Sequence, residues 1–313
     1  MKRLSVDFDV MIVGGGPAGL SAALWCRDLG INAMLFERSE GLGGQLLSIY
    51  DRIENHLGFS AADGRELRDR FIDHVTNRRV PIGTRSAVAS IDVEQKTITL
   101  DDGGTYSARA IIIATGVRRR ELGVPGEKEF VGKGILHSGA GSRRDVSGQK
   151  VVIVGGGDAA IENSVILSEF AEKVTVIHRR GEFRARPELI AAAKRGVNIE
   201  FVLDTEVTAI NGNEAVTSVD VINKVSRDSL TIAADAVLVR IGVQPNTEML
   251  NDQLVLDNEG YIRVDATGKS SAQGIFAVGD VANPVSPTIS TAVGSGASAA
   301  KAANALITTS PNV

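Results

Sequence analysis

The chain has 313 residues, of which 43% are hydrophobic and 23% charged, and its formal net charge at pH 7 is −4. This composition is ordinary for a globular protein and the length suits two domains. The charge gives no reason to expect nucleic-acid binding, and no apolar run approaches the ~20 residues of a membrane-spanning helix. We expect a cytoplasmic protein, because the N-terminus passes into the first strand with no visible signal peptide.

The first predicted element is a buried strand at residues 8–13. It is followed by the motif Gly14-Gly15-Gly16-Pro17-Ala18-Gly19 and a helix at about 17–29. In such a motif the first glycine permits a tight turn, the second lets the backbone approach a pyrophosphate, and the third lets helix and strand pack. The helix N-terminus then offers free N–H groups to the phosphates. The helix also holds Cys26, the only cysteine, which we interpret as a packed residue.

A second strand, at residues 32–36, ends at Glu37. An acid about 20 residues after such a motif accepts hydrogen bonds from ribose hydroxyls. Residues 80–113 alternate as strands do, with a turn at residues 102–104, and the apolar run stops at Ala114-Thr115-Gly116. This half of the sequence therefore predicts a dinucleotide site.

The same plan is repeated from about residue 150, with a strand, the motif Gly155-Gly156-Gly157-Asp158-Ala159-Ala160, a helix and a strand at 173–177. No acid follows this strand. The sequence His178-Arg179-Arg180-Gly181-Glu182-Phe183-Arg184 stands there instead. Guanidinium groups hold a ribose 2′-phosphate through bidentate hydrogen bonds, whereas a carboxylate repels it. The two motifs together predict FAD at the first site and NADPH at the second.

The last part of the chain is predicted to return to the first domain. A strand at 236–242 is followed by a linker at 244–246, and a further strand ends in Gly279-Asp280. This ending puts a carboxylate at the carboxyl edge of a sheet, where ligands bind in open α/β folds. A final helix at about 291–307 is rich in alanine and glycine, which suits close packing over a cofactor.

As a set, these sequences resemble the low-molecular-weight thioredoxin reductase family of flavoproteins over nearly the whole chain. The matching segments also include Gly43-Gly44-Gln45, Glu54-Asn55 and Glu162. The resemblance implies an α/β fold with two Rossmann-like three-layer dinucleotide-binding domains. An NADPH domain of residues 118–244 would be inserted into an FAD domain of residues 1–117 and 245–313. It further implies hinge linkers between the domains and a homodimer.

Together, the motifs and the resemblance predict two sets of cofactor-binding residues and no metal site. The predicted FAD-binding residues are Gly14, Gly16, Pro17, Ala18, Gly19, Glu37, Arg38, Gly44, Gln45, Asn55, Val88, Ala114, Thr115, Gly116, Gly279, Asp280, Thr288 and Ile289. The predicted NADPH-binding residues are Gly155, Gly157, Asp158, Ala159, Ala160, Glu162, His178, Arg179, Arg180, Arg184, Ile241 and Gly242.

Two features of the family are missing from the chain. Thioredoxin reductases carry Cys-x-x-Cys-Asp just before the second glycine motif. The ungapped equivalent here is residues 138–142, with Ser138 and Gly141 at the cysteine positions. Neither residue relays two electrons as a dithiol does, so we expect no thioredoxin reduction through an internal disulfide. The family's Arg-Gln pair after Gly-Asp is also replaced, by Pro287-Thr288, which leaves backbone N–H groups and the Thr288 hydroxyl for the flavin.

A sister group with the same fold also lacks the cysteine pair: the thioredoxin-reductase-like ferredoxin/flavodoxin–NADP⁺ reductases. They pass electrons directly from the flavin to a one-electron carrier. They usually have a C-terminal aromatic residue stacked on the flavin, whereas no aromatic residue follows Phe276 here. Tyr50 and Phe59 are the nearer aromatic candidates, or are plain core.

The sequence therefore predicts an NADPH-dependent FAD oxidoreductase. Its acceptor would be ferredoxin or flavodoxin, a quinone, free flavin or oxygen. Two alternatives stay open: a binding protein that responds to redox state or NADPH with little turnover, and electron flow in the reverse direction to NADP⁺.

Residues outside the glycine motifs are weaker candidates. His137 is a candidate proton donor to reduced flavin, or a loop histidine without a role. The arginines at 118–120 and 143–144 are candidate contacts for an acidic carrier protein, or solvated charges.

Overall fold

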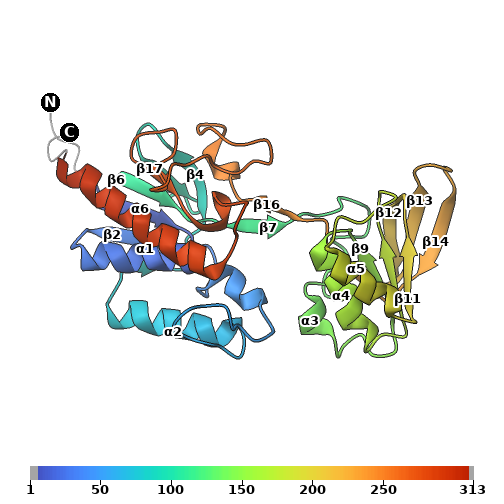
Figure 1. Cartoon of the computed structure of the whole chain (residues 1–313). Coiled ribbons are helices and arrows are strands. Elements are labelled where there is room, and N and C mark those ends of the chain that lie inside the picture. Colours follow the sequence, from blue (N-terminus) through green and yellow to red (C-terminus); the bar gives the residue numbers. More distant parts are fainter. Residues whose placement is uncertain (1–5, 310–313) are drawn as a thin grey trace. The chain divides into compact units, whose positions relative to one another are not determined.

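The computed structural model describes residues 6–309 and divides the chain into two compact units (Figure 1). Of the described residues, unit 1 comprises 6–118 and 244–309, and unit 2 comprises 119–243. The chain passes between the units through β7 (Val117–Arg119) and β16 (Val243–Pro245), which pair as a two-stranded sheet. Unit 2 is thus an insertion within unit 1.

Unit 1 is built on a sheet of order β3-β2-β1-β6-β5-β4, with β17 also paired to β6. Strands β1, β2, β3 and β17 run parallel to their neighbours, whereas β4, β5 and β6 are joined in antiparallel fashion. The bounds are β1 Phe8–Val13, β2 Ala33–Phe36, β3 Ile82–Gly83, β4 Val88–Asp92, β5 Thr97–Leu100, β6 Thr105–Ile113 and β17 Ile275–Ala277. The antiparallel part is closed by a turn in which the Asp102 carboxylate accepts from the Gly104 N–H at 2.9 Å.

Two helices of unit 1 pack together on one face of this sheet, α1 (Pro17–Asp28) and α6 (Ile289–Thr309) (Figure 1). Alternate residues of β1 serve opposite faces: Val10 and Ile12 pack toward these helices, and Met11 and Val13 toward a second core. A Cβ on Gly296 would overlap the Ala18 carbonyl oxygen, so the two helix backbones lie in close contact. The remaining helical elements are α2 Gly64–Asn77, η1 Gly44–Ser48, η2 Glu248–Leu250 and η3 Gly279–Val281.

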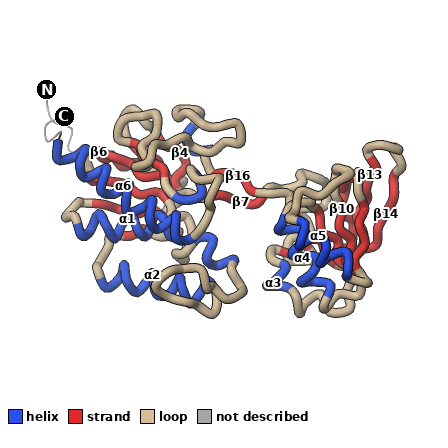
Figure 2. The backbone as a smooth tube through the Cα atoms, viewed as in Figure 1, coloured by secondary structure: helices blue, strands red, loops and turns tan. Residues whose placement is uncertain are grey.

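Unit 2 has three layers. A parallel sheet of order β11-β10-β9-β15-β8 lies between helices and an antiparallel sheet of order β12-β13-β14 (Figure 2). Val151 and Ile153 of β9 pack toward the helices, and Val152 and Val154 pack toward the antiparallel sheet. The strands are β8 Ile135–Leu136, β9 Lys150–Val154, β10 Lys173–Ile177, β11 Ile199–Val202, β12 Thr205–Gly212, β13 Val216–Asn223, β14 Ser229–Ala233 and β15 Ala236–Val239. The helices are α3 Gly139–Ser142, α4 Asp158–Ser168 and α5 Pro187–Arg195.

The predicted α/β class with two Rossmann-like units is confirmed, and several element boundaries differ from the prediction. The strand predicted at 236–242 ends at Val239: Arg240 N still donates to the Val154 carbonyl of β9 at 2.7 Å, and the backbone then changes direction at Gly242, which has a φ of +102°. The last helix begins at Ile289 rather than near 291. Among the helices of residues 6–309, none has the length and apolar character needed to cross a bilayer. No cluster of metal-ligating side chains occurs in that range.

Candidate functional site

The first glycine motif forms the turn between β1 and α1. Gly14 has a φ of +110°, and a Cβ at this position would overlap the Ala114 carbonyl oxygen. A Cβ on Gly19 would overlap the Gly14 carbonyl oxygen, so this glycine allows helix and strand to pack. Gly16 differs, because the nearest atom to a Cβ there would be the Gly44 Cα at 4.0 Å. Packing therefore requires the first and third glycines, whereas the second leaves open space at the N-terminus of α1.

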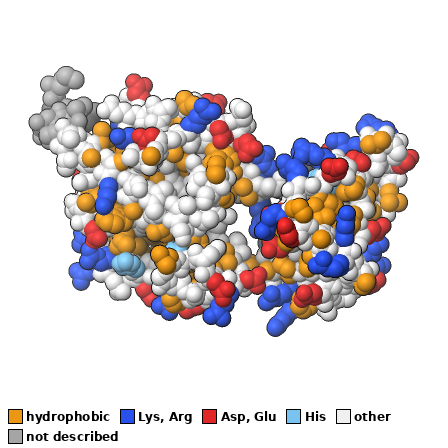
Figure 3. All heavy atoms as spheres, in the orientation of Figure 1, with side chains coloured by type: hydrophobic (Ala, Val, Ile, Leu, Met, Phe, Trp, Pro, Cys, Tyr) orange, Lys and Arg blue, Asp and Glu red, His pale blue; other side chains and the backbone are white. Residues whose placement is uncertain are grey.

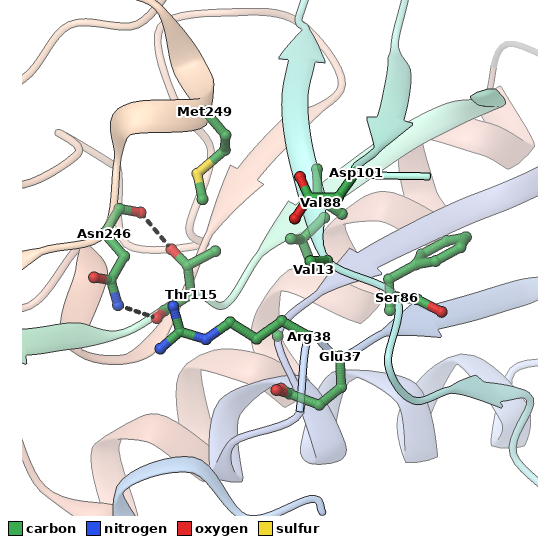
Figure 4. A pocket seen from close by; sticks show the side chains of 12 residues that line it. Val13, Glu37, Arg38, Ser86, Val88, Asp101, Thr115, Asn246 and Met249 are labelled. Atoms are coloured by element: carbon green, nitrogen blue, oxygen red, sulfur yellow. Dashed lines mark hydrogen bonds between the residues drawn. The ribbon is translucent and has the colours of Figure 1, made fainter. Parts of the chain in front are cut away.

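A cavity of about 230 Å³ opens beside this turn (Figure 4). Its walls bring together five of the predicted FAD-binding residues: Gly14, Glu37, Arg38, Val88 and Thr115. The other lining residues were not among them: Val13, Phe36, Ser86, Ala87, Asp101, Asn246 and Met249. The cavity thus combines residues from β1, β2, β4 and the segment that returns from unit 2.

Glu37 is held rigidly at the end of β2. Its side chain is only 8% exposed, and its two carboxylate oxygens accept from the Gly15 N–H at 2.7 Å and the Ser39 N–H at 2.8 Å. Each carboxylate oxygen has a further lone pair. The side chain therefore fixes the glycine turn and can still accept a hydroxyl from a bound ligand.

Asn246 is the main residue of this site that the sequence reading missed, since it was interpreted only as part of a linker. Thr115 Oγ1 donates to the Asn246 carbonyl at 2.7 Å, and Asn246 Nδ2 donates to the Thr115 carbonyl at 2.8 Å (Figure 4). The Arg118 guanidinium donates to Asn246 Oδ1 at 2.8 Å and also pairs with Glu248. The outgoing and returning segments of unit 1 are thus locked together beside the cavity.

A second group of predicted residues meets at the short helices η1 and η3. Gln45 Nε2 donates to Asp280 Oδ2 at 2.9 Å. Burial raises the pKa of the Asp280 carboxyl, and the hydrogen bond from Gln45 opposes that shift. Gly279, with a φ of +68°, donates its N–H to Ser295 Oγ of α6 at 3.0 Å. These contacts bring an amide, a carboxyl group and the last helix to the carboxyl end of β17.

The start of α6 uses Thr288 as a cap. The Thr288 hydroxyl accepts from the Thr291 N–H at 3.2 Å, and its carbonyl accepts from the Ala292 N–H at 3.0 Å. This capping explains why the helix begins at Ile289. It also uses the Thr288 hydroxyl, which is predicted to face the flavin. Nearby, His56 Nδ1 lies 3.4 Å from Ser290 Oγ, whereas Asn55 is exposed.

The two aromatic candidates of this unit differ in their surroundings. Tyr50 is 42% exposed, and Phe59 is half-buried with the Arg70 guanidinium 3.6 Å from its ring centroid. On the visible face of unit 1, acidic and basic side chains are interspersed among apolar ones (Figure 3).

The glycine motif of unit 2 repeats the same geometry between β9 and α4. Gly155 has a φ of +152°, and a Cβ there would overlap the Arg240 carbonyl oxygen. No atom lies within 4 Å of the position that a Cβ on Gly157 would take. Ala160 stands at the third position and is completely buried. Like the first turn, this one leaves open space at its second motif glycine, Gly157, which lies at the N-terminus of α4. No side chain caps this helix end.

Three exposed arginines follow β10: Arg179, Arg180 and Arg184. No ion pair of these side chains is present within residues 6–309. The loop that carries them is fastened to the glycine turn, because the Arg184 N–H donates to the Gly156 carbonyl at 2.8 Å. The Asp158 carboxylate accepts from both the N–H and the Nε of Arg186, each at 2.8 Å. An anion bound at the turn would therefore meet an ordered loop with unneutralised guanidinium groups.

His178 does not lie among these arginines, although it was predicted with them. Its side chain is 7% exposed and stacks on Phe183 with ring centroids 5.6 Å apart, and a Cβ on Gly156 would overlap its ring. Its Nε2 is buried and has no hydrogen-bond partner within the described residues. Burial is the main cause that lowers the pKa of His178, with the neighbouring arginine charges adding to it. The structure thus places a neutral imidazole beneath the turn, where it supports the loop.

The segment that contains Ser138 and Gly141 forms a short helix, α3. Ser138 Oγ accepts from the Gly141 N–H at 3.2 Å as the cap of α3. A Cβ on Gly139 would overlap Asn163 Oδ1 of α4, so this segment rests directly on the helix that follows the glycine turn. His137 is exposed, and its carbonyl accepts from Arg240.

Three further predicted residues of unit 2 are accessible at the surface. Glu162 of α4 is exposed, and Ile241 and Gly242 are exposed just after β15. They flank the turn on the helix side and on the β15 side respectively.

Comparison with known proteins shows the family to which the chain belongs. The model of the family described as "Pyridine nucleotide-disulphide oxidoreductase" matches residues 8–296. The chain is similar to thioredoxin reductase of Mycolicibacterium smegmatis, with 35% identity over 302 residues that cover 96% of each protein. Thioredoxin reductase of Bacillus subtilis is 32% identical, with 94% of this chain and 93% of that protein covered. The crystal structure of thioredoxin reductase from Lactococcus lactis gives a TM-score of 0.83 at 31% identity, covering 97% of this chain and 100% of that one.

Proposed function

The chain belongs to the pyridine nucleotide-disulphide oxidoreductase family, and on that premise we propose that it is an NADPH-dependent FAD oxidoreductase of the thioredoxin reductase type that works without an internal disulfide. FAD binds unit 1 and NADPH binds unit 2. Two electrons pass from NADPH to the flavin and then directly to an external acceptor. The protein acts as a homodimer, as expected from the family resemblance.

The single cysteine carries this proposal. An internal disulfide needs two thiols, and the sequence has only Cys26. That side chain is completely buried in α1, and burial raises the pKa of its thiol to about 12. The thiolate is the reactive form of cysteine, so Cys26 is inert at neutral pH. Ser138 and Gly141 cannot store electrons at the positions where the family's dithiol is expected. Electrons that reach the flavin must therefore leave it directly.

The residues of unit 1 fit FAD. The open space at Gly16 allows a pyrophosphate to approach the backbone, and the uncapped N–H groups of α1 point to it. Glu37 accepts from ribose hydroxyls, and the cavity walled by Val88 and Met249 takes the adenine. Gln45 and Asp280 bind the middle of the cofactor at the carboxyl end of β17. The remaining proposed contacts are Gly14, Pro17, Ala18, Gly19, Arg38, Gly44, Asn55, Ala114, Thr115, Gly116, Gly279, Thr288 and Ile289.

The residues of unit 2 fit NADPH. Arg179, Arg180 and Arg184 are exposed and hold the 2′-phosphate, which distinguishes NADPH from NADH. Gly155 and Gly157 let the pyrophosphate reach the start of α4, with Ala160 packed behind the turn. Asp158 orders the arginine loop through Arg186. Ala159, Glu162, Ile241 and Gly242 complete the proposed set. His178 supports this loop from beneath and does not touch the ligand.

The bound cofactors supply the hydride chemistry, and no acid or base of the protein is required for it. The task of the chain is to hold both rings and to exclude water. His137 is accessible as a proton donor in the reoxidation of reduced flavin, a proposal that its exposure permits.

The acceptor is an electron carrier such as ferredoxin or flavodoxin, a quinone or free flavin. Two arginines considered as carrier contacts are already engaged, because Arg118 pairs with Glu248 and Arg120 Nε donates to the Val243 carbonyl at 2.9 Å. Arg144 is exposed in the segment that follows α3 and is the better candidate for meeting an acidic carrier.

An acceptor panel tests the proposal. NADPH oxidation is followed anaerobically with ferricyanide, a soluble quinone, flavodoxin and thioredoxin as separate acceptors, beside the Cys26→Ala variant. We expect turnover with at least one direct flavin acceptor and none with thioredoxin, in the wild type and in the variant alike. Thioredoxin reduction by the wild type that is lost in the variant would contradict the proposal.

A further inference from the structure

The carboxyl end of β15 holds a buried cation that no acidic side chain within residues 6–309 neutralises. Arg240 directly follows this strand and is 8% exposed. Its Nη1 donates to the Val239 carbonyl at 2.8 Å, and its Nη2 donates to the His137 carbonyl at 3.1 Å. Both acceptors are neutral. The guanidinium thus ties the end of β15 to the end of β8 and keeps its full positive charge.

A second arginine adds to the positive charge at this place. Arg119 in β7 is exposed, and its charge acts on the guanidinium of Arg240. Burial is the main cause that lowers the pKa of Arg240 to about 10, and the charge of Arg119 adds to the effect. Both groups remain protonated at neutral pH. Buried charges in proteins are usually paired, so an unpaired one at a sheet's carboxyl end points to a role toward a ligand.

The order of the strands places Arg240 on a definite side of the dinucleotide site. The exposed arginines follow β10, the glycine turn follows the neighbouring β9, and Arg240 follows β15 on the other side of β9. Arg240 adjoins the turn directly, since its N–H donates to the Val154 carbonyl at 2.7 Å and its own carbonyl lies against Gly155. A dinucleotide with its 2′-phosphate at β10 and its pyrophosphate at β9 extends its other half toward β15.

We propose that Arg240 is a specificity-determining residue that makes unit 2 bind the neutral, reduced nicotinamide more tightly than the cationic, oxidised one. This inference rests on the proposed function, in which NADPH binds unit 2. The two forms of the ligand carry the same phosphates and differ in charge only at the nicotinamide ring. A fixed cation on the β15 side therefore repels the oxidised ring alone. NADP⁺ then binds unit 2 more weakly than NADPH does.

A merely structural role for Arg240, as a clamp between β15 and β8, makes a different prediction. Loosening the clamp would weaken both forms of the ligand by the same factor. The ratio of the two affinities therefore isolates the effect of the charge, whatever the substitution does to the fold.

The test uses the FAD-loaded protein and calorimetric titration with NADP⁺ and with 1,4,5,6-tetrahydro-NADP, a neutral analogue that cannot transfer hydride. We expect the wild type to bind the neutral analogue about three- to tenfold more tightly, the order that one unit charge produces across a partly solvated site. Arg240→Met should bring the ratio close to one, and Arg240→Lys should retain it. Arg195→Met is the matched control, because Arg195 is exposed at the end of α5, which leads to the opposite edge of the sheet.

Two results would overturn the inference: a wild type that binds NADP⁺ as tightly as the analogue, or an Arg240→Met variant with an unchanged ratio. Arg240→Gln retains an N–H donor for the two carbonyls and gives the same test if the methionine variant does not fold. A wild type that binds neither ligand would overturn the proposed function itself, and this inference with it.

Discussion

Gln45 and Asp280 are joined by a 2.9 Å hydrogen bond although 235 positions separate them in the chain. The bond connects the segment after the first βαβ unit to the strand end that the chain reaches only after it has completed unit 2. Burial raises the pKa of Asp280, and the hydrogen bond from the Gln45 amide opposes the shift. The two residues together therefore influence the ionisation of the carboxyl group at the carboxyl end of β17.

The Asp280 carboxyl should make the stability of the flavin-free protein depend on pH. Its pKa is raised in the folded state, so the folded protein binds the proton more tightly than the unfolded chain does. The charged form therefore destabilises the fold above the raised pKa, and this cost disappears as the pH falls through it. We expect Asp280→Asn to raise the Tm of the apoprotein at pH 7 and to lose that advantage at acidic pH. Thermal unfolding of both proteins across this range measures the effect, and an advantage that grows toward acid would refute it.

Substitutions of the two glycines in the unit 2 turn should affect the free energy of unfolding and the NADP⁺ affinity differently. Gly157 has an ordinary φ of −97° and open space at its Cβ position. Gly157→Ala should therefore change the free energy of unfolding by less than about 0.5 kcal/mol, and weaken NADP⁺ binding at least about tenfold because the methyl group meets the pyrophosphate. Calorimetry and thermal unfolding measure the two quantities.

Gly155→Ala is the contrasting variant of the same turn. Its φ of +152° and the overlap of a Cβ with the Arg240 carbonyl make the substitution costly for the fold itself. We expect a loss of at least about 2 kcal/mol of stability. Equal stability losses in the two glycine variants would show that the space at Gly157 is not reserved for a ligand.

Asp158 should act on the ligand through the loop that carries the arginines. Its carboxylate binds Arg186 at two points, and both bonds are lost in Asp158→Ala. We expect NADP⁺ affinity to fall about tenfold, since the 2′-phosphate then meets a disordered loop, with the FAD content unchanged. Glu200→Gln is the control, because it breaks the exposed pair with Lys173 in the same unit. A similar loss of affinity in both variants would argue against a positioning role for Asp158.

Cys26 should be dispensable for electron transfer. The side chain is completely buried in the core between the sheet and α1 and α6. Cys26→Ala should cost about 1 kcal/mol of stability through the lost packing and leave NADPH oxidation unchanged, and the wild type itself should resist labelling by thiol reagents under native conditions. A variant with normal flavin content and no turnover would give this thiol a redox role that the structure does not suggest.

The local motifs were predictable from the sequence, because the geometry of a glycine turn between a strand and a helix depends on residues that are adjacent in the chain. Gly14, Gly16 and Glu37 lie where the motif requires them, and the repeat at Gly155 and Gly157 follows the same rule. Asn246 and Met249 were not predictable as part of the cavity, since the chain brings them there after a separate folded unit.

Side-chain direction also lay beyond the sequence pattern. His178 stands next to two exposed arginines in the chain, yet its ring turns inward under Gly156 and stacks on Phe183. Thr288, whose hydroxyl is predicted to face the flavin, also uses that hydroxyl to cap α6. In both cases a local packing or capping interaction engages a group that the linear pattern assigned to the ligand.

If the flavin is the only two-electron acceptor on the chain, an anaerobic titration with NADPH reveals this in its stoichiometry. The visible flavin band is followed as NADPH is added to the FAD-loaded protein, with NADH in a parallel titration. We predict complete bleaching at about one NADPH per flavin, with NADH far less effective, because no dithiol accepts a second pair of electrons. Bleaching that requires two equivalents, or no bleaching despite tight NADPH binding, would contradict the account.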